Sequence, residues 1–497
     1  MFKNFPGYKL LESIQKKKSH KRERKFPLNA IKLIFIIAIT SVIALLPTES
    51  FGIEGLTAIH QRIIALFVFA ALMWLTETMP SWVTSMVVVT VMLFTVSTSS
   101  FSFLRPEGGV GLVPFKSIFA CFSNPTIMLF IGGFVLAIGL TKVKLDVALA
   151  RVLLKPFGTR SEIVLLGFIL VTAIFSAFVS NTATAAMMLA FLTPVLKSLP
   201  ADGKGRIALA LAIPVGANLG GMITPIGTPP NMIALDYLSS QGMGISFVDW
   251  TIKMAPFVVV LLVIAWLLLR ILFPFKQKNI KIEIEGEIKW NYKTWSVVVA
   301  FILTIFMWMF GTDLWGVDTN VVAMIPVAIF CATGILTRRD LEEINWSVLW
   351  MVAGGFALGV ALNYSDANSA SLSSLIVKSV PFDNFSPLVV MILAGLICFG
   401  FSNFISHSAA TSLLVPVLGV VASGLGTALD NFGGPQAMLV GIAIASSVSM
   451  ILPISTPPNA IAHSTGFIEQ KDMMKVGIIV GLVGLVLGYG MLIFIGF

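Results

Sequence analysis

The stretch ITPIGTPPN at residues 223–231 recurs as ILPISTPPN at residues 451–459. Each copy lies inside a long apolar segment. Two consecutive prolines cannot continue a helix, although they fit the first turn of a new one. Each copy therefore predicts a broken helix, whose first half ends near Gly227 or Ser455 and whose second half starts at the prolines. A simple proline kink is the alternative interpretation.

A second pair of matching segments lies upstream of these motifs, at an offset of 226 residues. FSAFVSNTATAAMML at residues 175–189 matches FSNFISHSAATSLLV at residues 401–415. In both copies a polar triplet interrupts an apolar run, and an unsatisfied polar group is costly in hydrocarbon. We therefore expect two re-entrant helical hairpins, 162–200 and 388–423, whose tips carry amides and hydroxyls to the membrane midplane. Hydrogen bonds from these hydroxyls within their own helices are the alternative.

The composition around these motifs excludes a soluble protein. Of the 497 residues 57% are hydrophobic and only 11% are charged, whereas a soluble domain carries about 25% charged residues. Long continuous apolar runs also exclude a transmembrane β-barrel. The three cysteines have no zinc-site spacing, and we expect no metal site. The fold class predicted is an all-α polytopic membrane protein of about 11 transmembrane helices plus the two hairpins.

The distribution of basic residues predicts the topology. Apolar runs place the eleven spans near 28–46, 62–77, 82–97, 126–141, 207–238, 254–273, 295–311, 319–336, 346–362, 435–464 and 474–496. With the basic N-terminal arm in the cytoplasm, 27 of the 33 Lys and Arg residues lie inside and five outside. We expect a cytoplasmic N-terminus and an extracellular C-terminus. The basic arm then needs no partner beyond anionic lipid, and no nucleic acid is expected.

The ordered matches between the two halves indicate a duplicated unit. The predicted parts are a basic cytoplasmic arm (1–27), a first transmembrane helix with its loop (28–61), one repeat (62–274), a polar cytoplasmic linker (275–293) and a second repeat (294–497). Each repeat holds five spans and one hairpin, so the second copy starts on the opposite side of the membrane. Inverted repeats of this kind build secondary transporters, which bind substrate near the midplane where the repeats meet. A duplication without a transport role stays open.

The polar interruptions contain no Lys or Arg, so an anion would be bound by Asn, Thr, Ser and backbone amides. Helix N-termini attract carboxylates through their positive end, and the carbonyls of an ended half-helix coordinate cations. Two opposed tips and two opposed helix ends suit a short molecule with a negative group at each end. An intramembrane enzyme is the competing class. It is disfavoured because the chain has no HExxH motif and no Walker A motif, and no assignable pair of Asp residues at membrane depth. We expect no catalytic residues.

The paired motifs, the two halves and the span count resemble the divalent anion:sodium symporter family of INDY-type dicarboxylate transporters. The resemblance covers nearly the whole chain after residue 60. It implies a homodimer, with a fixed scaffold and a transport domain that carries the substrate by an elevator motion.

The resemblance also implies the site residues. The expected substrate-binding residues are Asn181, Thr182, Thr228, Pro229, His407, Ser408, Thr456 and Pro457. If Na⁺ is used, a first cation site would take groups from Ser176, Ser180, Asn181 and Gly227. A degenerate second cation site would correspond to Ser402, His407 and Ser455. No cofactor is expected other than Na⁺ as a coupling ion.

One position departs from the family pattern. His407 stands where the family has Asn, and Ser408 follows it in place of Thr. Asn offers an oxygen to Na⁺, whereas a neutral imidazole offers one nitrogen and a protonated one repels the ion. One interpretation is that His407 is a hydrogen-bonding substitute for Asn. The other is that the second sodium site is missing. On the second interpretation, a protonated ring beside the substrate would neutralise charge permanently and hinder return of the empty carrier.

We therefore favour a plasma-membrane exchanger of C4/C5 dicarboxylates, of the succinate, malate, fumarate or 2-oxoglutarate type, that is largely Na⁺-independent. A Na⁺-coupled symporter of dicarboxylates, sulfate or citrate is the alternative. The intramembrane enzyme stays a remote third hypothesis.

Overall fold

The computed structural model describes residues 26–200, 203–280 and 289–496, and over these ranges the chain is built from helices and loops. The basic arm and most of the polar linker fall outside the described residues. Nine of the described helices are long and apolar enough to cross a membrane, and shorter apolar helices accompany them. The prediction of an all-α polytopic membrane protein is confirmed.

Helices cover each apolar run that the sequence assigns to a span. The first group lies N-terminal to the first polar triplet: α2 (Phe26–Leu45), α3 (Ala58–Thr76), α4 (Ser81–Thr95), α5 (Phe115–Ala120), α6 (Pro125–Lys142) and α7 (Leu145–Leu154). The second group contains the first pair of motifs: α8 (Ser161–Phe178), α9 (Asn181–Ser198), α10 (Gly205–Gly220), α11 (Pro229–Ser240) and α12 (Phe247–Leu272).

The C-terminal half repeats this order of long and broken helices. It begins with α13 (Tyr292–Trp315), α14 (Thr319–Val322), α15 (Met324–Ala332), α16 (Arg338–Glu342), α17 (Trp346–Asn363) and α18 (Leu372–Ser379). It continues with α19 (Pro387–Phe404), α20 (His407–Leu425), α21 (Gly434–Ser447), α22 (Pro457–Ser464) and α23 (Gln470–Phe494).

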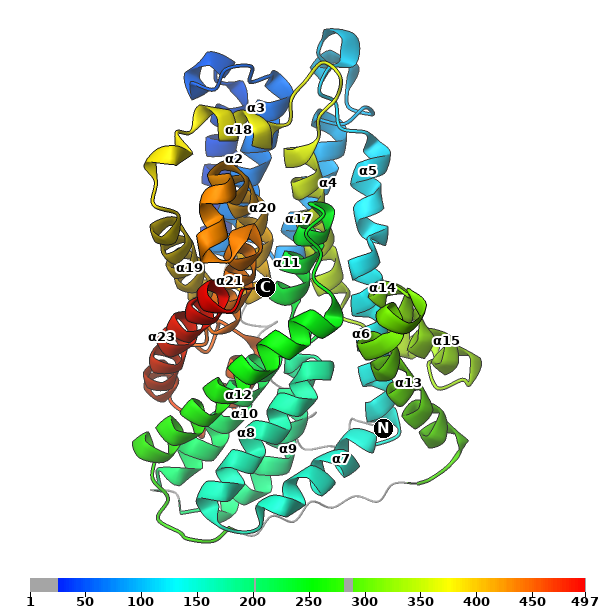
Figure 1. Cartoon of the computed structure of the whole chain (residues 1–497), viewed down its shortest axis with the longest axis vertical. Helices are drawn as coiled ribbons and strands as arrows, with labels where there is room; N and C mark the ends of the chain where they lie inside the picture. The colour runs from blue at the N-terminus through cyan, green and yellow to red at the C-terminus, as the bar shows by residue number, and fades with distance from the viewer. Residues whose placement is uncertain (1–25, 201–202, 281–288, 497) are drawn as a thin grey trace.

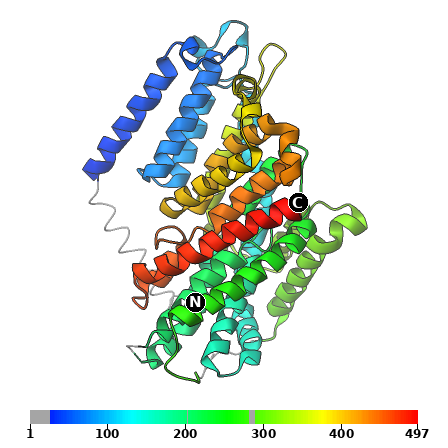
Figure 2. The same ribbon diagram turned by 60° about the vertical axis from the view of Figure 1, so that its left-hand side comes forward.

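Different helices lie at the two ends of the molecule's long axis, with others between them (Figure 1). Figure 1 shows α2, α3 and α18 at one end of the molecule and α7, α8, α9 and α10 at the other. In Figure 2 α2 and α3 stand side by side at the edge, while α23 crosses the middle of the molecule. One continuous hydrophobic core, which includes the fully buried Trp74, Trp250 and Phe168, joins these helices.

Glycines allow close approach between several pairs of helices. A Cβ on Gly216 of α10 would lie 2.7 Å from the carbonyl oxygen of Ile169 in α8. A Cβ on Gly354 of α17 would lie 2.7 Å from the Ser85 hydroxyl of α4. Small residues let helix backbones approach closely inside membranes, where packing rather than water drives association. Residues of all four of these helices line the site described next.

The two broken helices differ in detail from the sequence prediction. α10 ends at Gly220 and α21 ends at Ser447, so each first half stops several residues before the predicted Gly227 and Ser455. A loop of turns fills each interval before the prolines begin the second half. In each loop the last residue of the motif, Asn231 or Asn459, donates hydrogen bonds to loop carbonyls and holds the loop in this non-helical conformation.

Candidate functional site

Four helices begin at one cavity. α9, α11, α20 and α22 start at the polar triplets and at the two Thr-Pro-Pro-Asn motifs, and their first residues line a cavity of about 330 Å³. The motif residues along its wall are Ser180, Asn181, Thr182, Gly227, Thr228, Pro229, Ser406, His407, Ser408, Ser455, Thr456 and Pro457. Segments more than 200 residues apart in the chain therefore converge on one space.

All eight residues expected to bind substrate lie on this cavity. Of the residues expected to bind cations, Ser180, Gly227 and Ser455 also line it, whereas Ser176 and Ser402 are fully buried behind it. The structure thus brings the predicted set together. The roles of these residues as ligands stay predictions.

Local capping explains why the helices start where they do. The hydroxyls of Ser180 and Ser406 each accept a hydrogen bond from a backbone N–H three residues on, at 3.3 Å. Thr228 and Thr456 are extended, with φ of −146° and −138°, and each precedes two prolines that are preset for a first helical turn. Each start leaves backbone N–H groups without helical partners, and their partial positive charge favours an anion.

No lysine or arginine of the described chain is available in this cavity to bind an anion. Among the residues that the structure describes, its lining contains no Lys, Arg, Asp or Glu, and His407 is the one titratable side chain in it. Donors therefore come from hydroxyls, amides and helix N-termini. These groups give the cavity partial positive charge from dipoles that are fixed to the helices.

The sequence analysis did not single out the Asn that closes each motif. Both Asn231 and Asn459 are buried, and their amides hold loop carbonyls in place. Asn231 Nδ2 donates to the carbonyls of Gly221 and Thr224 at 3.1 and 2.9 Å. Asn459 Nδ2 donates to those of Met450 and Leu452 at 2.9 and 3.1 Å. Their repetition in both motifs was the signal that could have identified them.

Two residues of the first predicted cation set, Ser176 and Asn181, place oxygens close together, and the carbonyl of Ala217 joins them. Ser176 Oγ lies 2.6 Å from Asn181 Oδ1 and 2.7 Å from the carbonyl oxygen of Ala217. The hydroxyl has one proton, so it can donate to only one of these two acceptors. Oxygen atoms gathered in this way are the ligands that a hard cation prefers. These residues fit Na⁺.

The second predicted set does not form such a cluster. His407 Nε2 lies 2.5 Å from the carbonyl oxygen of Ser449. A carbonyl cannot donate, so the ring nitrogen carries the proton and donates it. Ser455 Oγ donates to the carbonyl of Leu452 at 2.7 Å, and the polar contact of Ser402 Oγ is Cys398 Sγ at 3.8 Å. No hydrogen bond joins either serine to His407 over the described ranges. At the position of His407 the second set therefore has a ring N–H donor, whereas the first set has the amide oxygen of Asn181 at the matching position.

Another part of the cavity lining was not predicted. It comes from Trp82 at the start of α4, from Phe130 and Phe134 of α6, and from Asn345 and Met351 at the N-cap and in the second turn of α17. The hydroxyl of Ser85 donates to the carbonyl of Met351 at 3.1 Å and holds α4 against α17. The cavity is therefore lined by the motif-bearing helices and by α4, α6 and α17, whose contribution is mainly aromatic and apolar.

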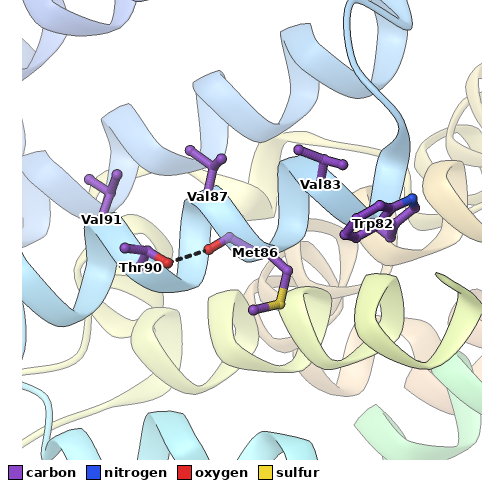
Figure 3. A pocket seen from close by; sticks show the side chains of 6 residues that line it. All are labelled: Trp82, Val83, Met86, Val87, Thr90 and Val91. Atoms are coloured by element: carbon purple, nitrogen blue, oxygen red, sulfur yellow. Dashed lines mark hydrogen bonds between the residues drawn. The ribbon is translucent and has the colours of Figure 1, made fainter. Parts of the chain in front are cut away.

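A second hollow lies on the outer face of α4. It measures about 230 Å³ and is lined by Trp82, Val83, Met86, Val87, Thr90 and Val91 (Figure 3). Its hydroxyl, on Thr90, already donates to the carbonyl of Met86 at 2.7 Å. Apart from the indole of Trp82 and this engaged hydroxyl, the side chains that line the hollow are Val83, Met86, Val87 and Val91, which suit contact with lipid.

A helical membrane fold in which four helix starts meet at one cavity is the architecture expected of a transport protein. The model of the family described as "Sodium:sulfate symporter transmembrane region" matches residues 28–496. The chain belongs to this family, which confirms the resemblance to the divalent anion:sodium symporters. The prediction of a transporter rather than an enzyme is confirmed by the family and by its relatives.

Curated relatives match along nearly the full chain. An uncharacterised transporter of Haemophilus influenzae is 30% identical over 471 residues, covering 91% of this chain and 94% of the relative. The sodium-dependent dicarboxylate transporter SdcS of Staphylococcus aureus strain USA300 is 28% identical, covering 94% and 92%. Among solved structures, the Alcanivorax borkumensis YdaH transporter is similar in fold, with a TM-score of 0.54 and 15% identity, covering 88% of this chain and 99% of that one.

Proposed function

We propose that the protein is a secondary transporter of C4/C5 dicarboxylates of the succinate, malate, fumarate or 2-oxoglutarate type. The observation that carries the proposal is the convergence of four helix N-termini on one cavity whose described lining contains no Lys or Arg. Each half of the chain contributes two of these N-termini. A dicarboxylate could place one carboxylate at the N-termini of each half, whereas a monocarboxylate would leave the N-termini of one half without an anion.

The relatives support this substrate class. SdcS proteins, 28% identical to this chain, are named dicarboxylate transporters. The family description names sulfate, a compact dianion, as a further candidate. Competition tests the choice. We expect unlabelled succinate, malate or fumarate to inhibit uptake of labelled succinate into proteoliposomes, and monocarboxylates to have no effect. Inhibition by sulfate alone would contradict a dicarboxylate site.

We further propose exchange with little Na⁺ dependence, on the basis of His407. The Nε2–H of His407 donates a hydrogen bond to the carbonyl of Ser449. No cation is therefore needed to bind that oxygen at the second hairpin tip. The hydrogen bond requires only a neutral ring, and no ion pair of the described residues involves His407, so exchange does not require the protonated ring inferred from the sequence. The empty carrier would present four helix N-termini without an anion, which disfavours its return across the membrane. The loaded carrier has this charge neutralised and crosses in both directions.

Na⁺-coupled symport is the second candidate, and one observation favours it. The Ser176, Asn181 and Ala217 oxygens form a cluster suited to Na⁺, and the SdcS relatives are named sodium-dependent. When bound, Na⁺ would supply positive charge beside an incoming carboxylate. His407→Asn would restore an amide at the second tip. We expect this variant to gain Na⁺ dependence relative to wild type, with Ser408→Thr as a control that changes only the neighbouring residue. Equal Na⁺ dependence of H407N and wild type would contradict the role given to His407.

The arrangement supports an elevator motion of the motif-bearing helices against the others. The cavity lies between them, next to the ends of α4 and α17 that the charge bias places in the cytoplasm. We propose that this is the inward-facing state of an inverted-repeat homodimer in the plasma membrane, with its N-terminus inside and its C-terminus outside. Mass determination in detergent tests the dimer. A cysteine at Asp313 that an impermeant reagent reaches only from the cytoplasm would contradict the topology.

A further inference from the structure

The hydroxyl of Thr456 is held in an unusual hydrogen-bonding environment. Its oxygen accepts two hydrogen bonds, one from Asn218 Nδ2 at 3.2 Å and one from the backbone N–H of Asn459 at 3.2 Å. A hydroxyl oxygen has two acceptor positions and one proton. With both acceptor positions occupied, the proton must point elsewhere, and the hydroxyl has no acceptor among the described residues.

The direction of these bonds is fixed by a chain of amides. The carbonyls of Met450 and Leu452 can only accept, so the nitrogen side of the Asn459 amide must face them. The oxygen of Asn459 then faces Asn218, whose Nδ2 donates to it at 3.1 Å. Asn218 therefore also turns its NH₂ group, and not its oxygen, toward Thr456. The main-chain carbonyls of Met450 and Leu452 thus set the orientation of the Asn459 amide and, through it, that of the Asn218 amide. The Asn218 NH₂ group then requires the Thr456 proton to point away from it.

Asn218 makes this connection across the two halves of the chain. It lies on α10, 238 residues before Thr456, and it is almost fully buried while lining the cavity. Among the described residues its Oδ1 has no hydrogen-bond partner. Both N–H groups of this amide are engaged, one with Thr456 and one with Asn459, so these two contacts set its orientation.

The first half lacks the same connection. The corresponding position, 228 residues after Asn218, is Ser446, whose hydroxyl donates to the carbonyl of His407 at 3.0 Å. Among the described residues, Thr228 makes no capping hydrogen bond with its side chain, and Asn231 Oδ1 has no partner. Of the two motif threonines, Thr456 is therefore the one whose hydroxyl oxygen accepts two hydrogen bonds in the described chain.

We propose that Asn218 is a positioning residue that, together with Asn459, turns the Thr456 hydroxyl proton into the cavity so that Thr456 donates to a substrate carboxylate. The inference rests on the proposed function and names the donor at one of its two carboxylate positions. A hydroxyl preset as a donor binds an anion without first reorienting, and it disfavours a cation at the same point.

The test is a double-mutant cycle on succinate counterflow in proteoliposomes. Asn218→Ala frees the hydroxyl to rotate, and Thr456→Val removes it. We expect each single variant to raise KM about tenfold, the factor for a weakened hydrogen bond to a charged group. The maximal rate per folded protein should change less than twofold. The double variant should match Thr456→Val alone, because Asn218 acts through Thr456.

Controls separate this role from a merely structural clamp. Thr172→Val alters a buried hydroxyl of α8 outside the cavity and should leave KM unchanged. Asn218→Ser keeps one hydroxyl donor and should give a KM between those of wild type and Asn218→Ala. If Asn218→Ala does not fold, Asn218→Ser with and without Thr456→Val completes the cycle. An unchanged KM in the Asn218 variants, or multiplicative effects in the double variant, would overturn the inference.

Failure of the proposed function gives a different result. Wild type would then show no succinate counterflow. The same proteins would be compared by the rise in melting temperature with inorganic sulfate, since a preset donor serves any dianion. A smaller rise in Asn218→Ala than in wild type supports the inference, and an equal rise refutes it.

Discussion

Substitution of Gly221 by Ala tests the position of the Asn181 amide. Gly221 follows α10 with φ of −60° and ψ of −19°, which Ala adopts without strain. A Cβ there would lie 2.6 Å from Asn181 Oδ1, 2.9 Å from Nδ2 and 3.1 Å from Cγ. Ordinary contacts begin near 3.4 Å, so the amide must move by about 0.8 Å, the shortfall at Oδ1. It cannot move toward Ser176 without closing a 2.6 Å contact.

A displacement of about 1 Å in a group that positions a substrate costs about 10²-fold in rate. We therefore expect Gly221→Ala to reduce the initial rate of succinate uptake into proteoliposomes by ten- to a hundredfold, at equal amounts of folded protein. Gly400→Ala is the matched control, because a Cβ on this helical glycine of α19 meets nothing within 4 Å. We expect it to transport within about twofold of wild type. Wild-type uptake by Gly221→Ala would refute the assignment of Asn181 to the site.

Three further substitutions give separate tests. Asn181→Ala should leave the protein folded and reduce succinate transport severely, and normal transport would contradict the tip site. Burial raises the pKa of Asp146, on the short helix α7, to about 6. Its ionisation therefore costs stability as pH rises from 3.8 to about 6, and Asp146→Asn should melt higher than wild type at neutral pH but not below pH 3.8. Burial opposes ionisation of Asp340, but hydrogen bonds from Lys142 and Thr337 outweigh it and hold its pKa below 3.8. Asp340→Asn should therefore melt lower than wild type above pH 3.8, and this difference should vanish as pH falls through the lowered pKa. A pH-independent difference would contradict either pKa assignment.

Much of the fold could be predicted from the sequence because two local signals are strong. Long apolar runs define spans through the cost of exposed backbone in lipid, and paired prolines define helix starts through their fixed φ. The end of α10 at Gly220 was not predictable in the same way. It depends on Asn231, whose amide gathers the Gly221 and Thr224 carbonyls, and this contact exists only in the folded loop.

The candidate site was predictable where a motif marks it and not elsewhere. The polar triplets and Thr-Pro-Pro-Asn motifs recur in order, so their meeting at one cavity follows from duplication. Trp82 and Asn345 line the same cavity without a motif, because helix packing alone brings them there. Asn218 was missed because its partner Thr456 is 238 residues away in sequence. The hydrogen bond from His407 to Ser449 likewise depends on the packing of α20 against α21.

The central claim is that this chain exchanges dicarboxylates across the membrane with little need for Na⁺. The most direct measurement is uptake of labelled succinate into proteoliposomes, loaded or not loaded with unlabelled succinate, each with and without an inward Na⁺ gradient. The account predicts rapid uptake only in loaded vesicles, at similar rates with and without Na⁺. Robust uptake into vesicles without internal substrate, driven by the Na⁺ gradient, would contradict it and establish a symporter.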